Sequence, residues 1–235
     1  YVRMAAAAKD MVTRLATATE HGNLKVGLVP FSAMVRTSMP SAMVTQAAAG
    51  ETWNGCTQDR AYPNNTGVAS PSGGADSKWG YFDNTSENKG AYDCNAYAAK
   101  SLDILPLTDD FVKVGKKLDA MRPLGNTNIA LGAEFGWNLL DDAAPYAQAV
   151  PYNDKETRKY LVLLTDGVQT SKEWGPGKSR TIEHGQKNLV TLCTGMRAKG
   201  ITVFTIAYDV TDKQVTTLLK SCAPGKYFEP GRPME

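Results

Sequence analysis

Two runs of apolar residues in the second half of the chain have the length of a β-strand. Residues 161–164 read Leu-Val-Leu-Leu and are followed by Thr165, Asp166 and Gly167, and the second run covers residues 201–208. A strand that is apolar on both faces is typical of a parallel sheet covered by helices on both sides. The pattern therefore predicts that every side chain of residues 161–164 is buried.

Most other apolar positions recur at the 3.6-residue spacing of helices. Helices are expected over residues 1–19, 109–121, 129–140, 180–199 and 211–222, and a third strand over residues 25–31. Thr108 and Thr211 are the expected N-caps of two of these helices, since a threonine hydroxyl accepts hydrogen bonds from the first helical turn. The alternation predicts an α/β fold: a doubly wound, mostly parallel sheet with helices on both faces and the three strands at its centre.

Residues 37–99 interrupt this alternation with a segment rich in glycine, serine, asparagine, aspartate and proline. The segment also contains many aromatic residues: Trp53, Tyr62, Trp79, Tyr81, Phe82, Tyr92 and Tyr97. Disordered linkers are poor in aromatic side chains, so we expect an irregular insertion with some packing of its own. Two interpretations stay open, a surface loop with a small satellite core or a recognition surface held by the rigid sheet.

Composition and charge agree with a single domain over residues 1–235. The 235-residue chain is 42% hydrophobic and 21% charged, which suffices for one substantial core. Its net charge of +2, with acids and bases interspersed, lacks the footprint of a nucleic-acid-binding protein. No run approaches the roughly 18 apolar residues of a membrane span, and any signal sequence or anchor is expected upstream of Tyr1.

The chain contains four cysteines, Cys56, Cys94, Cys193 and Cys222. None has the C-x-x-C spacing of a zinc site or a redox motif. An even number of well-separated cysteines indicates structural disulfides and a location outside the cytoplasm, whereas the alternative is four reduced thiols in a cytosolic protein. Of the three connectivities we favour Cys56 with Cys94 and Cys193 with Cys222, because each closes a loop of about 30 to 40 residues, worth roughly 3 to 4 kcal/mol.

Asp166 stands where a ligand site is expected in an α/β protein. Ligands bind beyond the carboxyl ends of parallel strands, and Gly167 allows the chain to turn sharply there. A second polar loop, residues 125–128 (Gly-Asn-Thr-Asn), precedes the helix that begins at Ile129. Taken alone, Asp166 is equally compatible with an ordinary turn or capping residue.

The pairing of GNTNI (residues 125–129) with LLTDG (residues 163–167) resembles the second and third metal-binding loops of von Willebrand factor A domains. The segments KVGLVPFS, WNGC, LPLTDD, GNTNIALGAEFGWNLL and CAPGKYF occur in the order seen in bacterial TadG-like pilus-assembly proteins. The outward-facing part of those proteins looks like a von Willebrand A domain with a cysteine-bridged insertion. The resemblance therefore covers nearly the whole chain.

The family's first metal loop, D-x-S-x-S, is absent from this sequence, and the Asp-Asn-Thr-Ser segment at residues 83–86 follows no apolar strand. In the family this loop ends the first, central strand. The chain is therefore expected to be a fragment that opens within the family's first helix and stops before its closing helix.

The resemblance implies a binding module that is not an enzyme. In the family, a threonine hydroxyl and an aspartate help to hold one divalent cation, Mg²⁺ or Mn²⁺, and the matching residues are Thr127 and Asp166. The cation would leave one position for a carboxylate of a protein partner, a pilus or envelope component in the periplasm or outside the cell. This fragment is expected to bind metal weakly or not at all.

Two alternatives remain. The domain could be a structural envelope scaffold with a decayed metal site, or a phosphatase-like hydrolase that uses Asp166 and a metal. The hydrolase would need a further carboxylate at a neighbouring strand end, where Asp209 is the candidate. His21 and His184 are not accompanied by any nucleophile or metalloprotease motif, so solvent-facing roles are expected for both.

Overall fold

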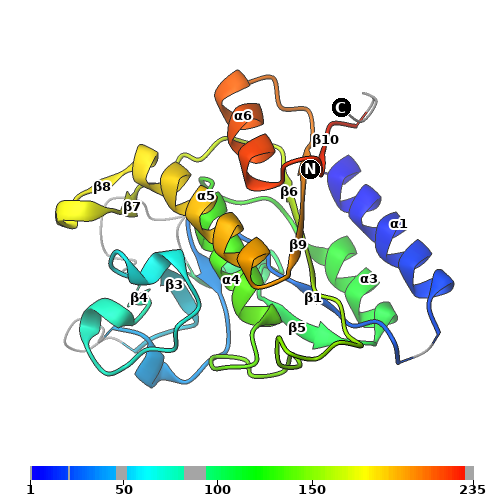
Figure 1. Cartoon of the computed structure of the whole chain (residues 1–235), viewed down its shortest axis with the longest axis horizontal. Helices are drawn as coiled ribbons and strands as arrows, with labels where there is room; N and C mark the ends of the chain where they lie inside the picture. The colour runs from blue at the N-terminus through cyan, green and yellow to red at the C-terminus, as the bar shows by residue number, and fades with distance from the viewer. Residues whose placement is uncertain (1, 21, 46–51, 82–93, 231–235) are drawn as a thin grey trace.

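The computed structural model describes residues 2–20, 22–45, 52–81 and 94–230 (Figure 1). Its α-helices are α1 (Val2–Ala18), α2 (Cys94–Ala99), α3 (Phe111–Ala120), α4 (Ile129–Leu140), α5 (Ile182–Ala198) and α6 (Lys213–Cys222). Its strands are β1 (Val26–Leu28), β2 (Val35–Arg36), β3 (Cys56–Gln58), β4 (Gly80–Tyr81), β5 (Leu105–Thr108), β6 (Tyr160–Thr165), β7 (Glu173–Trp174), β8 (Arg180–Thr181), β9 (Thr202–Ala207) and β10 (Tyr227–Phe228). Its 3-10 helices are η1 (Ser41–Met43), η2 (Asn64–Thr66), η3 (Ala75–Ser77) and η4 (Pro176–Lys178). None of the helices within these ranges is long and apolar enough to cross a lipid bilayer.

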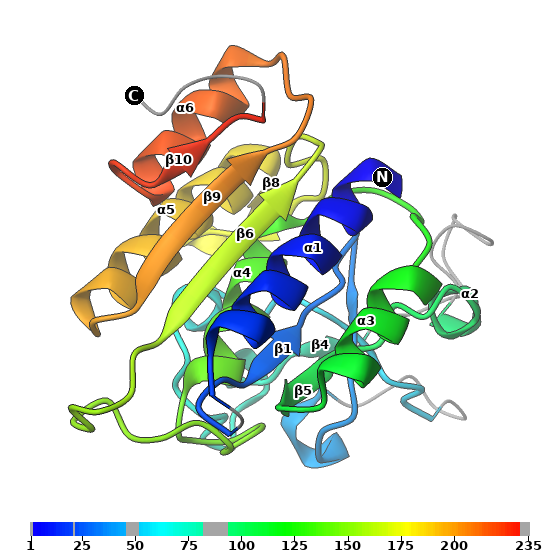
Figure 2. The same cartoon turned by 90° about the vertical axis from the view of Figure 1, so that its right-hand side faces the viewer.

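A parallel sheet with the strand order β10-β9-β6 contains both of the predicted apolar strands. β6 and β9 stay in register from Tyr160 opposite Thr202 to Thr165 opposite Ala207. Helix α5 connects the two strands, and it lies with α4 behind the sheet in Figure 2. The largest core cluster joins Leu161 and other inward side chains of the sheet to α4, α5 and α6.

Only one face of β6 is buried, so the prediction for residues 161–164 is wrong. Leu161 and Leu163 point into the core, whereas Val162 is 39% exposed and Tyr160 is 51% exposed. The reason is that α4 and α5 pack on the same side, and no described helix lies over the outer face of β6 and β9 (Figure 2). Helices over both faces of β6 and β9 are therefore not seen in the described part of the chain.

β1 does not join the parallel sheet, contrary to the prediction for residues 25–31. It pairs antiparallel with β5, with Val26 opposite Thr108, in a separate two-stranded sheet. Helices α1 and α3 pack against these strands through a small core of Val12, Leu105, Val114 and Leu118. Within the described ranges no strand joins β1 to β6, so the structure contains a small parallel sheet and not the full doubly wound one.

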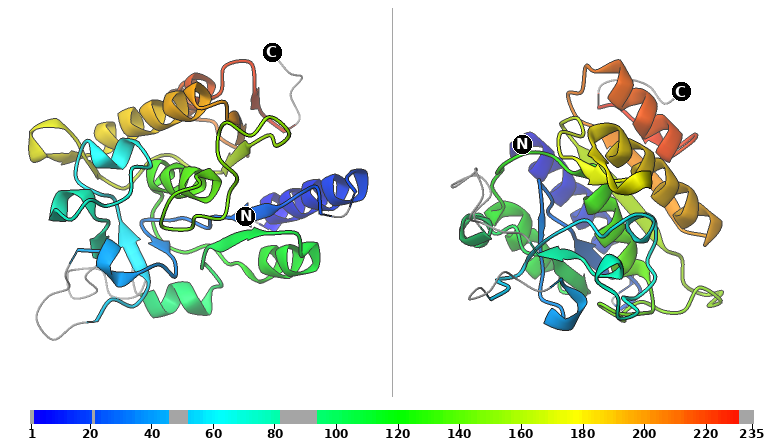
Figure 3. Two further views of the ribbon diagram at one scale, coloured as in Figure 1. Left: turned by 60° about the horizontal axis from the view of Figure 1, so that its bottom comes forward. Right: turned by 90° about the vertical axis from the view of Figure 1, so that its left-hand side faces the viewer.

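Strands β3 and β4 of the insertion form an antiparallel sheet with β2, which lies just before the insertion. Trp79 and Tyr97 are completely buried, and the Trp79 ring packs against Phe135 of α4 with 5.4 Å between the ring centroids. Phe82 and Tyr92 lie outside the described residues. The insertion lies on one side of α4, and α1 and α3 lie on the other (Figure 3). Trp79 therefore belongs to a core that includes side chains of α4, whereas Tyr62 is 43% exposed.

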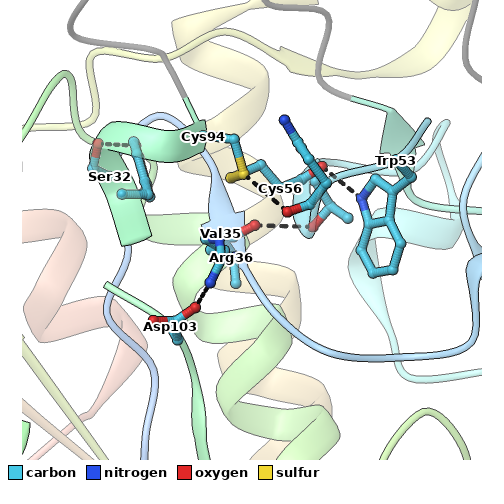
Figure 4. Close-up of a disulfide and its surroundings, with 10 residues drawn as sticks. Ser32, Val35, Arg36, Trp53, Cys56, Cys94 and Asp103 are labelled. Atoms are coloured by element: carbon cyan, nitrogen blue, oxygen red, sulfur yellow. Dashed lines mark hydrogen bonds and ion pairs between the residues drawn. A yellow bond between two sulfur atoms is a disulfide. The ribbon is translucent and has the colours of Figure 1, made fainter. Parts of the chain in front are cut away.

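Both favoured disulfides are present in the structure. Cys56 is bonded to Cys94, with 5.8 Å between their Cα atoms, and Cys193 to Cys222, with 5.1 Å. The first bond ties β3 to α2 (Figure 4), and the second ties α5 to α6. All four cysteines are buried, so each bond lies inside a core cluster.

Candidate functional site

Thr127 lies in the loop that leads into α4. The next residue, Asn128, caps the helix, because its side-chain oxygen accepts a hydrogen bond from the Leu131 amide at 3.2 Å. The Asn128 amide donates to the carbonyl of Ser32, shortly after β1, at 2.8 Å. Asn128 is buried and Thr127 is half-buried. The hydrogen bonds of the buried Asn128 thus hold the loop in place, and Thr127 stays near the surface.

Asp166 follows β6 directly and is exposed. The turn is held by Thr165, whose hydroxyl accepts a hydrogen bond from the Gly167 amide at 3.2 Å. Further along, the Thr170 amide donates to the carbonyl of Thr127 at 2.9 Å. Gly167 lies so close to the first loop that a Cβ atom on it would be 3.4 Å from the Thr127 hydroxyl oxygen. The structure therefore brings the two predicted loops together at the carboxyl end of β6.

Asp209 lies at the corresponding end of the neighbouring strand. It follows β9 and is exposed, with a left-handed backbone φ of 58° that aspartate tolerates better than most residues. The amide of Tyr208 donates to the carbonyl of Thr165 at 2.8 Å, so the two strand ends are adjacent. The edge that contains Thr127 and Asp166 thus includes a second nearby loop with a carboxylate.

The oxygen atoms at this edge suit a hard divalent cation in kind but not in number. Mg²⁺ takes hydroxyl and carboxylate oxygens in octahedral geometry and gives up its water reluctantly. Among the described residues, no three acidic, histidine or cysteine side chains lie close enough together to hold a metal ion. Because the D-x-S-x-S loop is also absent from the sequence, Thr127 and Asp166 do not make a complete cation site on their own.

His184, the histidine within the described residues, is half-buried. His184 packs against Gly175 in the turn between β7 and β8, and its Nδ1 atom lies 3.2 Å from the carbonyl oxygen of Ser179. This places the ring in the packing of that hairpin. His21 and residues 83–86 lie outside the described residues, and the expectation that the chain is not an enzyme stays a prediction.

A buried cluster of charged side chains, which no motif indicates, joins the insertion to α4. Arg60 donates from Nε to Oε1 of Glu134 at 2.7 Å, and these side chains are 0% and 1% exposed. The indole nitrogen of Trp79 donates to the same oxygen at 3.0 Å, and the guanidinium lies 4.6 Å from the centre of the Trp79 ring. Arg60 also donates to the carbonyl of Ala69 at 2.6 Å. The positive charge of Arg60 is therefore paired with Glu134, and a backbone carbonyl and the Trp79 ring also contact the guanidinium group.

The β7–β8 hairpin extends this cluster towards α5. Asp59 of the insertion forms an ion pair with Arg180 of β8 and accepts a hydrogen bond from the Trp174 amide at 2.8 Å. Glu173 of β7 accepts a hydrogen bond at its Oε2 atom from the side chain of Asn188, on α5, at 2.9 Å. Asp59, Glu173 and Asn188 are buried. The insertion, the hairpin, α4 and α5 thus meet around polar groups.

Burial raises the pKa of all three carboxyl groups in this cluster. The pKa of Glu134 rises to about 7, although the neighbouring Arg60 opposes the shift. For Asp59 burial outweighs the lowering effect of Arg180. For Glu173 burial and then the negative charge of Asp59 raise the pKa well above its usual value. Such perturbed groups occur at active sites and in structural networks, and the lack of exposure here favours a structural role.

One signal in the sequence points towards this cluster. Glu134 lies in the middle of α4, a helix whose sequence, IALGAEFGWNLL, is otherwise mostly apolar and buried. A carboxylate in such a helix needs a charged or hydrogen-bonding partner. The partner, Arg60, is 74 residues away, and no local spacing identifies it.

No protein-family model matches the chain, and no curated protein matches it either. Among solved structures, the chain is similar to proximal thread matrix protein 1 (PTMP1) from the mussel byssus, in two crystal forms, with 21% sequence identity and TM-scores of 0.36 and 0.35. The matches cover 53% and 52% of this chain and 27% of PTMP1, so the chain spans about a quarter of that protein's length. The resemblance to von Willebrand A domains and TadG-like proteins stays an expectation that rests on the motifs.

Proposed function

We propose that this chain is an extracytoplasmic binding module that contacts a protein partner through a loop edge, defined as residues 125–128, 166–170 and Asp209. One observation carries the proposal: the Thr127 and Asp166 loops are hydrogen-bonded to each other at the carboxyl end of β6. Loops that a rigid scaffold holds in place commonly contribute binding residues. The two disulfides support a location outside the cytoplasm. No catalytic step is included.

A divalent cation would strengthen such a contact only with more ligands than Thr127 and Asp166. Thr127 would offer a hydroxyl oxygen and Asp166 a carboxylate, either directly or through water. Two such ligands compete poorly with the hydration shell of Mg²⁺. We therefore expect weak or undetectable binding of Mg²⁺ or Mn²⁺ by this chain, and stronger binding once an upstream strand ending in D-x-S-x-S is added.

Calorimetric titration with Mg²⁺ and Mn²⁺ tests this expectation. The measurement compares the chain as given, the extended chain, and the extended chain with Asp166→Ala. We expect binding only by the extended chain, and its loss in the Asp166 variant. Asp10→Ala is the matched control, because Asp10 is an exposed aspartate of α1 whose ion-pair partner is Arg14 on the same helix. Tight binding by the chain as given would instead implicate Asp209 as a missing ligand.

A structural envelope scaffold is the second candidate, and the incomplete ligand set favours it. In a scaffold the loop edge would be an ordinary surface, and assembly would rest on other faces. Crosslinking in the native cell envelope distinguishes the two candidates. Unchanged crosslinked complexes with Asp166→Ala and Thr127→Ala would favour the scaffold, and loss of one specific partner would favour recognition through the loop edge.

A further inference from the structure

The joint between the insertion and the main body is made of buried charges. Asp59 and Arg60 come from the insertion, Glu134 from α4, and Glu173 and Arg180 from the β7–β8 hairpin. Three carboxyl groups thus face two guanidinium groups. If all five were ionised, one negative charge would remain uncompensated, and only Arg180 has a side chain with appreciable exposure. Burial of an unpaired charge is costly, so neutralisation of one group is favoured.

The hydrogen bonds identify which carboxyl group lacks compensation. Glu134 accepts from Arg60 and Trp79 at Oε1, and Asp59 accepts from the Trp174 amide and is paired with Arg180. Glu173, in contrast, has no cationic partner and accepts one hydrogen bond, from the neutral amide of Asn188.

Buried oxygen atoms without hydrogen-bond partners also identify Glu173 as the uncompensated carboxyl group. The Glu173 Oε1 atom is buried and has no hydrogen-bond partner among the described residues. The neutral side-chain amide of Asn128 is near the carboxyl group and lowers the pKa of Glu173. The Oε2 atom of Glu134 and the Oδ1 atom of Asn65 are buried and unpartnered too. The cluster therefore has an excess of acceptors and lacks a donor. A protonated carboxyl group supplies a donor and removes the excess charge in one step.

We propose that Glu173 holds a proton at neutral pH and that this proton fastens the insertion to α4 and α5, so that the insertion loosens when the surrounding medium becomes alkaline. The groups that act on Glu173 are Asp59 from the insertion, Glu134 from α4 and the neutral side-chain amides of Asn128 and Asn188. The cations of the cluster, Arg60 and Arg180, pair with Glu134 and Asp59. Neither cation pairs with Glu173 itself. Loss of the proton would leave the buried negative charge uncompensated.

The direction of the pH dependence follows from proton linkage. The pKa of Glu173 in the closed state is well above the usual glutamate value, because of burial first and the charge of Asp59 second. The opened state, with Glu173 in water, has the usual value and binds fewer protons. The closed state is therefore fully favoured below the usual pKa and loses stability as the pH rises through the raised pKa. Outside the cytoplasm the pH follows the medium, so the joint would respond to it.

Hydrogen–deuterium exchange tests the proposal on the whole chain. Opening of the insertion should accelerate exchange in peptides from residues 52–81, by up to about tenfold per pH unit beyond the intrinsic chemical rate, the slope expected for one proton. Peptides from β9 should show little of this extra dependence, because β9 contributes no side chain to the joint. Exchange in residues 52–81 that follows the intrinsic rate alone would overturn the proposal.

Variants assign the effect to one carboxyl group. Glu173→Gln keeps a neutral donor at the position, so the extra pH dependence should disappear. Glu183→Gln is the matched control, since Glu183 lies on the surface of α5 and pairs with Lys187. It should retain the wild-type response. A Glu173→Gln protein with the full pH dependence would contradict the assignment.

Two further measurements keep the test decisive if Glu173→Gln does not fold. In the wild-type protein, the infrared difference between neutral and alkaline pH should include the loss of a protonated carboxyl band in addition to that of Glu134, whose pKa is about 7. The absence of this additional band would overturn the proposal. Exchange at alkaline pH with added Na⁺ or Ca²⁺ tests for a bound cation. If either ion restores protection of residues 52–81 in the wild-type chain, a cation and not a proton closes the joint.

Discussion

Arg60 makes three kinds of contact from a position without solvent exposure. Its Nε atom is paired with Glu134, another nitrogen donates to the carbonyl of Ala69, and its plane lies over the Trp79 ring. A buried ion pair adds little stability compared with apolar packing, yet removal of one partner leaves an uncompensated charge. Loss of Arg60 is therefore expected to cost more stability than the intact ion pair contributes.

Arg60→Met should destabilise the folded chain by about 3 to 5 kcal/mol at alkaline pH, because Glu134 would stay buried without its cation. With a pKa of about 7 even beside Arg60, Glu134 takes up a proton readily in mild acid, so the loss should be smaller there. Urea unfolding at both pH values measures the difference. Arg14→Met is the control, since the Arg14–Asp10 pair is exposed and contributes little. Equal effects of the two substitutions would contradict the buried pair.

Single residues also explain why α3 and α6 begin elsewhere than the sequence pattern predicts. The N-cap of α3 is Asp110 and not the expected Thr108, and the Asp110 carboxylate accepts a hydrogen bond from the Lys113 amide. Likewise Asp212, and not Thr211, accepts from the amides of Gln214 and Val215 at the start of α6. Both aspartates lie closer to the first helical turn than the threonines. An aspartate also interacts favourably with the helix dipole, which a hydroxyl cannot do equally well.

At the scale of elements, the sequence predicts what depends on local pattern. The apolar runs at residues 161–165 and 201–208 are strands β6 and β9, and both favoured cysteine pairs are bonded. What it does not predict is the pairing of distant segments. β1 has the composition of a buried strand, but its partner is the antiparallel strand β5. The paired charges of Asp59 and Arg180 are likewise 121 residues apart, so no spacing could connect them.

The Cys193–Cys222 bond connects two helices of the main core. Its sequence separation is 29 residues, so replacement of both cysteines by alanine should destabilise the chain by about 2 to 5 kcal/mol. Denaturant unfolding of the double variant measures this loss. Mass spectrometry of peptides without reduction should link Cys56 to Cys94 and Cys193 to Cys222. Free thiols at all four positions would contradict both the pairing and the location outside the cytoplasm.

At the scale of the whole molecule, the outer face of the parallel sheet bears aromatic rings, and no helix of the described residues lies over it. The rings of Tyr160, Phe204 and Phe228 follow one another across β6, β9 and β10, with centroids 6.4 Å and 6.0 Å apart. Val162 lies on the same outer face of β6. Contiguous apolar patches on soluble proteins commonly mark contact surfaces. If no other molecule covers this face in solution, the described chain is stable with one face of its sheet in contact with water.

Two identical substitutions on neighbouring strands measure that state. Val162→Thr changes the outer face, and Val203→Thr changes the inner face, where Val203 is 1% exposed. A hydroxyl buried without a partner costs about 1 to 3 kcal/mol, whereas an exposed substitution usually changes stability by less than about 0.5 kcal/mol. Both keep a β-branched side chain, so strand propensity is nearly constant. We expect only Val203→Thr to lower the urea midpoint. Equal losses that grow with protein concentration, together with a dimer in sedimentation, would mean that a second copy covers the outer face.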